Sequence, residues 1–161
     1  QKKRNSQIGN YKAALMVCTG TGCIAGGAFT LKDLLTEELQ KRNLEDKYMI
    51  VPTGCNGFCA QGPIMVVQPE GIFYEKVKPT DIKEIVDKLE EGKYVDRLIF
   101  KDAQTKESIP YMKDIKFFGK QVLIALRNKG IINPENIDDA IARGAYQALS
   151  KALKMTQGEI I

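Results

Sequence analysis

Four cysteines are the residues of this chain with the clearest capacity for chemistry. They fall in two short clusters, Cys18-x4-Cys23 and Cys55-x3-Cys59, and no cysteine follows Cys59. The chain has no histidine, so we expect any transition-metal site to be built from these four thiolates. Four thiolates in two pairs suit a [2Fe–2S] cluster, in which each iron takes two protein ligands. The spacing therefore predicts one-electron transfer as the chemistry.

Other uses of the four thiols fit the spacing less well. Structural zinc sites favour Cys-x2-Cys pairs, whereas both spacings here are wider. A thiol–disulfide oxidoreductase would need Cys-x2-Cys at the start of a helix, and [4Fe–4S] clusters are also more often marked by such short runs. Four inert buried thiols would leave the paired spacing unexplained. Zinc, and a cluster that serves only structure or redox sensing, stay as alternatives.

Glycines surround both cysteine clusters. Because glycine has no side chain, the backbone can wrap closely around a metal cluster and direct N–H groups at sulfur. Such hydrogen bonds raise the reduction potential of a negatively charged cluster. The glycines are Gly20, Gly22, Gly26, Gly27, Gly54, Gly57 and Gly62. Candidate side-chain donors are Thr19, Thr21, Thr53 and Asn56, and candidates for keeping water away are Ala25, Ala28, Phe58, Pro63 and Ile64.

Hydrophobic patterning before the second cysteine cluster predicts a strand, a helix and a strand. The apolar run 13–17 is expected as a buried strand. Residues 30–42 are expected as a helix that Thr30 caps, with one face formed by leucines. The next strand is expected over 48–51, where Pro52 stops it. The leucines of the helix are Leu31, Leu34, Leu35 and Leu39.

The chain after the second cluster predicts a β-hairpin and another helix. Apolar residues over 64–67 and 72–77 flank the tetrapeptide 68–71, Gln-Pro-Glu-Gly, which has turn chemistry. Residues 80–91 follow with helical spacing, and Gly92 is expected to end that helix. The inward positions of the helix are Ile82, Ile85, Val86 and Leu89.

The element order predicts that the two cysteine clusters meet. A strand–helix–strand unit is almost always a right-handed crossover that joins parallel strands. Parallel strands direct their C-terminal ends to the same edge of the sheet. Cys18 follows the first strand directly, and Cys55 follows the second strand after Pro52-Thr53-Gly54. Both clusters are therefore expected at one edge, where open α/β sheets bind ligands.

The second half of the chain is expected to be organised separately. Residues 93–114 are polar and mixed and are interpreted as a linker or surface strand, followed by a second block over 115–161. Asn133 and Pro134 are expected to cap and open a third helix. Gly144 lies on the apolar side of that helix, where a neighbour could approach closely. The rest of that side comprises Ile137, Ala140, Ile141, Ala145, Ala148, Leu149, Ala152 and Leu153.

The composition indicates a globular chain. Of its 161 residues, 43% are hydrophobic and 27% are charged, as in ordinary domains. No apolar run has membrane or signal-peptide length, so we expect a cytoplasmic protein without a transmembrane segment. Because the first residue is Gln, we expect a trimmed N-terminus. Basic residues between positions 97 and 129, including Lys129, are interpreted mainly as solvated surface, with a docking face as the less favoured alternative, and not as a nucleic-acid site.

The two cysteine clusters, within residues 10–92, resemble those of the thioredoxin-like [2Fe–2S] ferredoxins. This family includes the small iron–sulfur subunit of bacterial NADH dehydrogenase and of related hydrogenases. The resemblance implies an α/β thioredoxin-like fold that holds one [2Fe–2S] cluster of low potential, with no catalytic residue. Cys18 and Cys23 would bind one iron, and Cys55 and Cys59 would bind the other.

Residues 115–161 resemble the opening of the flavin- and NADH-binding subunit of complex I and its hydrogenase relatives. The match is carried by Asn133-Pro134-Glu135, Ile141-Ala142-Arg143-Gly144 and Tyr146-Gln147-Ala148-Leu149. In electron-bifurcating and NADP-reducing hydrogenases, that subunit carries an N-terminal thioredoxin-like ferredoxin domain. The resemblance implies that this chain is the N-terminal portion of such a flavoprotein subunit.

The flavin and nucleotide loop of that subunit, and its [4Fe–4S] cysteines, come after this opening. We therefore expect FMN, NAD(H) and [4Fe–4S] clusters only in a longer protein. The expected partners are other subunits of a hydrogenase or NADH dehydrogenase complex, including ferredoxin-like subunits. Residues 93–161 would then tether the cluster domain to the flavin domain, and the polar character of the tether would let the cluster domain move between partners.

Overall fold

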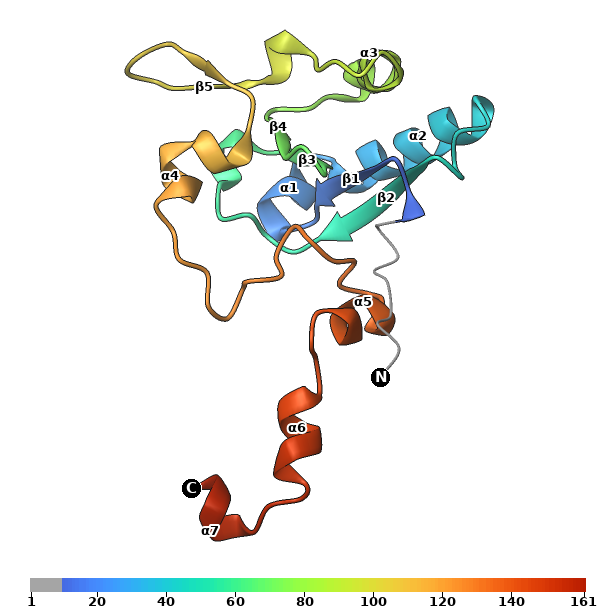
Figure 1. Ribbon diagram of the computed structural model, residues 1–161. Helices are drawn as coiled ribbons and strands as arrows, with labels where there is room; N and C mark the ends of the chain where they lie inside the picture. The colour runs from blue at the N-terminus through green and yellow to red at the C-terminus, as the bar shows by residue number, and fades with distance from the viewer. Residues whose placement is uncertain (1–9) are drawn as a thin grey trace.

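A computed structural model describes residues 10–161, and its centre is a four-stranded mixed sheet in the order β2-β1-β3-β4 (Figure 1). Strand β1 (Ala13–Cys18) lies inside the sheet and is buried along its whole length. It pairs in parallel with β2 (Tyr48–Thr53) and antiparallel with β3 (Met65–Gln68). Strand β4 (Ile72–Tyr74) completes a hairpin with β3. The predicted parallel crossover and the predicted hairpin are both confirmed.

Strand β2 continues through Pro52 to Thr53, so the prediction that Pro52 stops the strand is wrong. Strand β2 lies at the edge of the sheet, beside β1. Proline lacks an N–H group, and an edge strand tolerates that loss because its outer side needs no ladder bond. The extension matters for the cysteines, because Thr53 pairs with Cys18.

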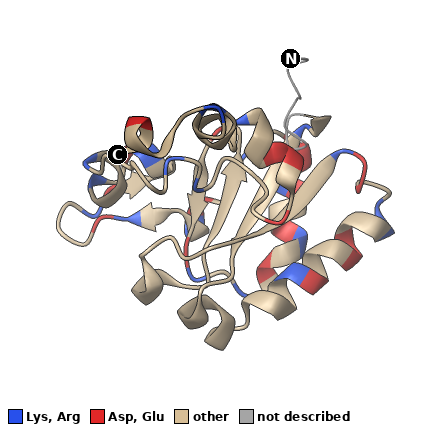
Figure 2. Cartoon of the chain, turned by 90° about the horizontal axis from the view of Figure 1, so that it is seen from below, with Lys and Arg blue, Asp and Glu red and all other residues tan. Residues whose placement is uncertain are grey.

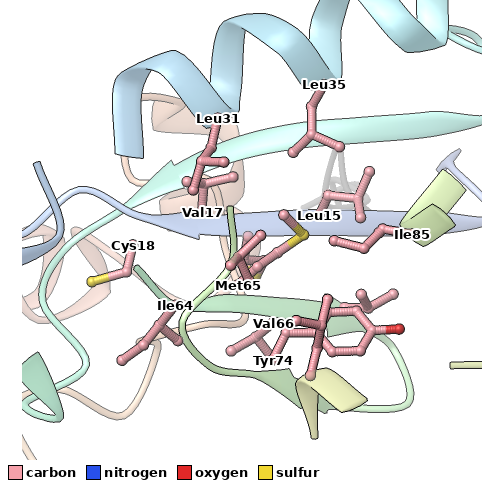
Figure 3. Packing of buried hydrophobic residues seen from close by; sticks show 14 of the residues in the cluster. Leu15, Val17, Cys18, Leu31, Leu35, Ile64, Met65, Val66, Tyr74 and Ile85 are labelled. Atoms are coloured by element: carbon pink, nitrogen blue, oxygen red, sulfur yellow. The ribbon is translucent and has the colours of Figure 1, made fainter. Parts of the chain in front are cut away.

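Helices α2 (Ala28–Lys41) and α3 (Ile82–Glu90) pack against each other and supply apolar side chains to the core. Leu31 and Leu35 point from α2 toward the strands, and Ile85 joins the same cluster from α3 (Figure 3). The predicted leucine face is confirmed. Charged residues are spread over the surrounding helices and loops, whereas the four strands of the central sheet carry none (Figure 2).

Helix α2 begins earlier than predicted, and Thr30 does not cap it. The N-cap is Gly27, whose φ of 92° is left-handed, a conformation that favours glycine. The earlier start places Ala28 in the core, where it is fully buried. Helix α3 begins at Ile82, after the 3₁₀ turn Pro79–Asp81, and Gly92 follows it with a φ of 69°.

The segment interpreted as a linker or surface strand adds residues to the same core. Val95, Leu98 and Ile99 are buried, and Ile99 forms an isolated bridge with Tyr74 of β4. The backbone N–H of Val95 donates to the Tyr74 hydroxyl at 3.1 Å. These contacts attach the start of the segment to β4. Beyond them, the short strands β5 (Phe100–Lys101) and β6 (Ser108–Ile109) form a separate ribbon.

The last part of the chain forms short helices, of which α6 and α7 extend away from the sheet (Figure 1). Asn133 does not cap the predicted helix; Asn136 does, because its side-chain oxygen accepts from two N–H groups at 2.8 and 3.2 Å. Gly144 and Tyr146, with φ values of 90° and 65°, divide the predicted helix in two. The helices are α4 (Lys116–Gly119), α5 (Ile137–Ala142), α6 (Gln147–Ala152) and α7 (Gln157–Ile160).

Within residues 10–161, none of the helices combines the length and the apolar character needed to cross a bilayer.

Candidate metal centre

The fold brings both cysteine clusters to one edge of the sheet, as the spacing predicts. Cys18 is the last residue of β1, and Cys55 lies just beyond the end of the parallel strand β2. The backbone N–H and the hydroxyl of Thr19 both donate to the Thr53 carbonyl, at 2.8 and 2.7 Å. These bonds fasten the first cysteine loop to the second at the point where the two strands end.

The second cysteine of each cluster is carried by a short helical turn. Cys23 lies in helix α1 (Thr21–Ala25), and Cys59 begins the 3₁₀ turn Cys59–Gln61. These two turns contact each other. Helical turns place the second thiol of each pair close to the first, so the four thiols come together from four adjoining elements.

The four thiols are neighbours, and all are free. The sulfur atoms of Cys55 and Cys59 are 3.5 Å apart. Cys18 interacts with the thiols of both Cys23 and Cys55, and Cys23 also feels the charge of Cys59. The two cysteine groups, Cys18 with Cys23 and Cys55 with Cys59, are therefore linked through thiol–thiol contacts.

Among residues 10–161, no three Cys, Asp or Glu side chains are grouped to hold a single metal ion. A cluster of two irons makes a different demand, since each iron takes only two protein ligands. The arrangement of thiols in two pairs is the one that such a cluster requires.

The two halves of the site differ in exposure. Cys18 and Cys23 are each 1% exposed, whereas Cys55 and Cys59 lie at the surface. Cys18 sits at the end of the hydrophobic cluster, beside Ile64 (Figure 3). One pair of sulfurs is thus shielded from water, and the other pair can be reached from outside.

The surroundings of the thiols change the acidity of three of them. Burial, with contributions from Cys18 and Cys59, raises the pKa of Cys23 to about 11. The pKa of Cys55 is lowered, first by the backbone N–H of Gly57, which donates to its sulfur at 3.2 Å, and further by the nearby charge of Lys129. The loop thus favours thiolate at Cys55, whereas the contact with Cys55 raises the pKa of Cys59 and burial disfavours a charge on Cys23.

Two glycines are required because the cysteines pack directly against them. A Cβ at Gly20 would lie 2.8 Å from the Cβ of Cys55, and a Cβ at Gly62 would lie 2.9 Å from the sulfur of Cys23. Gly54 has no atom within 4 Å of the corresponding position. The cradle is therefore tight at two positions and open at the third. A group of free thiols that leaves no room for a side chain at Gly20 or Gly62 fits a metal–sulfur cluster.

Some of the predicted auxiliary residues have other partners. The hydroxyls of Thr19 and Thr53 donate to backbone carbonyls and not to sulfur. Of the residues expected to keep water away, Ile64 is buried and Phe58 packs against the core. Ala25, by contrast, is exposed.

Sequence reasoning missed the side chains that reach the site from the second half of the chain. Phe117 stacks on Phe58 with ring centroids 5.1 Å apart. Lys129, interpreted as solvated surface, is only half exposed, and its ammonium donates to the backbone carbonyl of Asn56 at 3.2 Å. No local pattern marks these residues, because their partners lie more than fifty positions away in sequence.

Comparison with known proteins agrees with this site. The family model described as "Thioredoxin-like [2Fe-2S] ferredoxin" matches residues 4–90. A curated protein of Clostridium pasteurianum, "Ferredoxin, 2Fe-2S", is 38% identical over 98 residues, which are 55% of this chain and 96% of that protein. The crystal structure of the wild-type thioredoxin-like [2Fe–2S] ferredoxin from Aquifex aeolicus aligns with a TM-score of 0.53 and 32% identity, and covers 57% of this chain and 99% of that chain.

A larger relative matches over a shorter stretch. The "NADP-reducing hydrogenase subunit HndC" of Solidesulfovibrio fructosivorans is 52% identical over 42 residues, which are 26% of this chain and 9% of that subunit. The similarity thus extends to a protein far longer than the matched region.

Proposed function

The chain belongs to the thioredoxin-like [2Fe–2S] ferredoxin family, and we propose that its four cysteines together hold one such cluster. Cys18 and Cys23 are the proposed ligands of one iron, and Cys55 and Cys59 of the other. The observation that carries the proposal is the convergence of four free thiols from two distant loops at one sheet edge. The donor set fits, because four thiolates in two pairs are the ligands of a [2Fe–2S] centre.

A bound cluster supplies a site that takes up and releases one electron without a bond to any substrate. The chain's own residues set the conditions for that exchange. Burial of Cys18 and Cys23 keeps water from one side, whereas the exposed loop of Cys55 offers a short approach to a partner. The N–H of Gly57 aimed at the Cys55 sulfur offsets negative charge, which favours the reduced state.

The finer proposal is that the chain is the electron-transfer module of an NAD(P)H-linked flavoprotein oxidoreductase of the hydrogenase or NADH dehydrogenase type. It is supported by the match to the hydrogenase subunit and by the resemblance of residues 115–161 to the opening of a flavin- and NADH-binding subunit. In this proposal, FMN, NAD(H) and [4Fe–4S] clusters belong to a longer protein. The partners are other subunits of that complex, and residues 93–114 connect the two domains.

A second candidate, a redox-sensing module, is favoured by the exposure and the lowered pKa of Cys55. The two functions differ in reversibility. An electron carrier passes repeatedly between its oxidised and reduced forms, whereas a sensor loses or rearranges its cluster when oxidised. Repeated redox cycling of the loaded chain, followed by visible absorption, therefore distinguishes them.

The ligand assignment is tested by replacing Cys55 with serine in the full chain, reconstituted anaerobically with iron and sulfide. We expect the EPR signal of the reduced cluster to change or disappear, because oxygen replaces one sulfur ligand. Ser150→Ala, at an exposed position of α6, is a control that should leave the signal unchanged. An identical reduced-state signal in the Cys55→Ser protein would remove Cys55 from the ligand set.

A further inference from the structure

The segment over residues 115–130 returns to the cysteine loop, although it lies outside the region matched by the family model. The ammonium of Lys129 donates to the carbonyl of Asn56, the residue directly after Cys55. The next residue, Gly130, accepts a hydrogen bond at 2.7 Å from the side chain of Gln68, at the end of β3. The first bond therefore fastens the segment to the cysteine loop, and the second fastens the next residue to β3.

Aromatic contacts hold the same segment from its other end. Phe117 of α4 lies nearly parallel to Phe58, with an angle of 15° between the rings, and Phe58 directly precedes Cys59. Phe118 packs edge-on against Phe58, and the ammonium of Lys129 lies 5.7 Å from the Phe118 ring centroid. The lysine is thus placed by a backbone carbonyl and an aromatic face together, which restricts where its charge can lie.

A fixed positive charge beside the exposed cysteines has a definite consequence for a cluster held there. Reduction adds one negative charge, so a nearby ammonium stabilises the reduced state more than the oxidised state. Because Lys129 is half-buried, solvent screens it less than a free surface lysine.

We propose that Lys129 is a positioning residue that raises the reduction potential of the cluster, and that residues 115–130 therefore form part of the cluster site. This inference rests on the proposed function, since it needs a cluster bound by the four cysteines. It assigns to the second half of the chain a role in setting the electron-transfer potential.

The test is a redox titration of the full chain, loaded with cluster, with the reduced fraction followed by EPR. For Lys129→Gln, we expect the ratio of reduced to oxidised cluster at a fixed applied potential to fall about threefold to tenfold, where tenfold corresponds to 59 mV for one electron. Lys129→Arg keeps the charge and should titrate close to the unaltered chain. The control Lys151→Gln removes an exposed lysine of α6, a helix that extends away from the sheet, and should leave the potential unchanged.

The dependence of the potential difference on ionic strength is a second measurement, and a purely structural role of Lys129 would not produce it. The difference between the unaltered chain and Lys129→Gln should shrink as ionic strength rises, because salt screens the charge. Equal potentials in these two proteins, or equal shifts in the Gln and Arg variants, would overturn the inference. Iron and sulfide are measured in each protein. If the unaltered chain binds no cluster, the proposed function is overturned as well. If Lys129→Gln binds the cluster and its potential is unchanged, only this inference is overturned.

Discussion

The leucines of α2 and the apolar residues of α5 and α6 recur at the same helical spacing, yet they end in different environments. Leu31, Leu35 and Leu39 are at most 1% exposed. Leu149 and Leu153, by contrast, are 53% and 78% exposed. Apolar spacing creates a face, but only a partner buries it. Helix α2 has the sheet and α3 as partners, whereas α6 extends away from both (Figure 1).

The comparison predicts very different costs for the same substitution in the two regions. Leu35→Ala should lower the free energy of unfolding by about 2–5 kcal/mol, because it removes a fully buried side chain and leaves a cavity. Leu149→Ala should change it by less than about 0.5 kcal/mol, since that side chain is mostly in solvent. Urea unfolding of both variants measures the difference. Equal losses would show that α6 is packed in solution.

The cysteine cradle allows a similar contrast between two glycines. Gly62→Ala would place a Cβ 2.9 Å from the Cys23 sulfur, although its φ of −72° suits alanine. We expect the clash to reduce the iron and sulfide bound per chain by at least about half and to destabilise the chain by about 1–3 kcal/mol. Gly54→Ala meets no atom within 4 Å and should bind normal amounts. Normal binding by both variants would contradict the tight packing at Gly62.

Two tyrosines extend the comparison to alkaline pH. Burial raises the pKa of Tyr74 to about 12, above the value of about 10 expected in an unfolded chain. Between these values the folded chain binds the extra proton, so the stability contribution of Tyr74 is complete below about pH 10 and is lost as pH rises toward 12, at up to about 1.4 kcal/mol per unit.

Urea unfolding from pH 9 upward, about one unit below the unfolded-state pKa, provides the measurement. Tyr74→Phe should start lower in stability, because it loses the acceptor for the Val95 N–H, and should then fall less steeply with pH. Tyr146→Phe removes an exposed hydroxyl between α5 and α6 and is the matched control for the loss of a tyrosine hydroxyl. Identical slopes in all three proteins would mean that Tyr74 titrates normally.

The smallest effect concerns the cap of α5. Asn136→Ala removes the acceptor for the N–H groups of Asp138 and Asp139, which should cost that helix about 1 kcal/mol. Because α5 does not form part of the hydrophobic core, the free energy of global unfolding should change by less than about 0.5 kcal/mol. Amide exchange within α5 should nevertheless accelerate about fivefold, the equivalent of 1 kcal/mol. Unchanged exchange would show that the cap does not hold the helix.

Local residue patterns and the order of the elements are enough to predict most of the central fold. The leucine spacing identifies α2, and the parallel crossover brings Cys18 near Cys55 because both follow strands that end at one edge. Capping was harder to predict, because several residues compete for each helix start. Gly27, and not Thr30, is the N-cap of α2, and this earlier start of the helix places Ala28 in the core.

The contacts that residues 115–161 make could not be predicted from local patterns in the sequence. Asn133 has the same side chain as the true cap, but its oxygen accepts from the N–H of Glu135 in a local turn before the helix. Lys129 looks like any surface lysine in the sequence. Its contact with Asn56 depends on how the chain folds back over the cysteine loop, and residue spacing carries no information about such a return.

Iron and acid-labile sulfide analysis of the anaerobically reconstituted full chain, combined with EPR after reduction, tests the central claim most directly. The account predicts two irons and two sulfides per chain, and a signal that appears on uptake of one electron. One zinc per chain, with no sulfide and no signal, would show that the four thiols serve a different metal site.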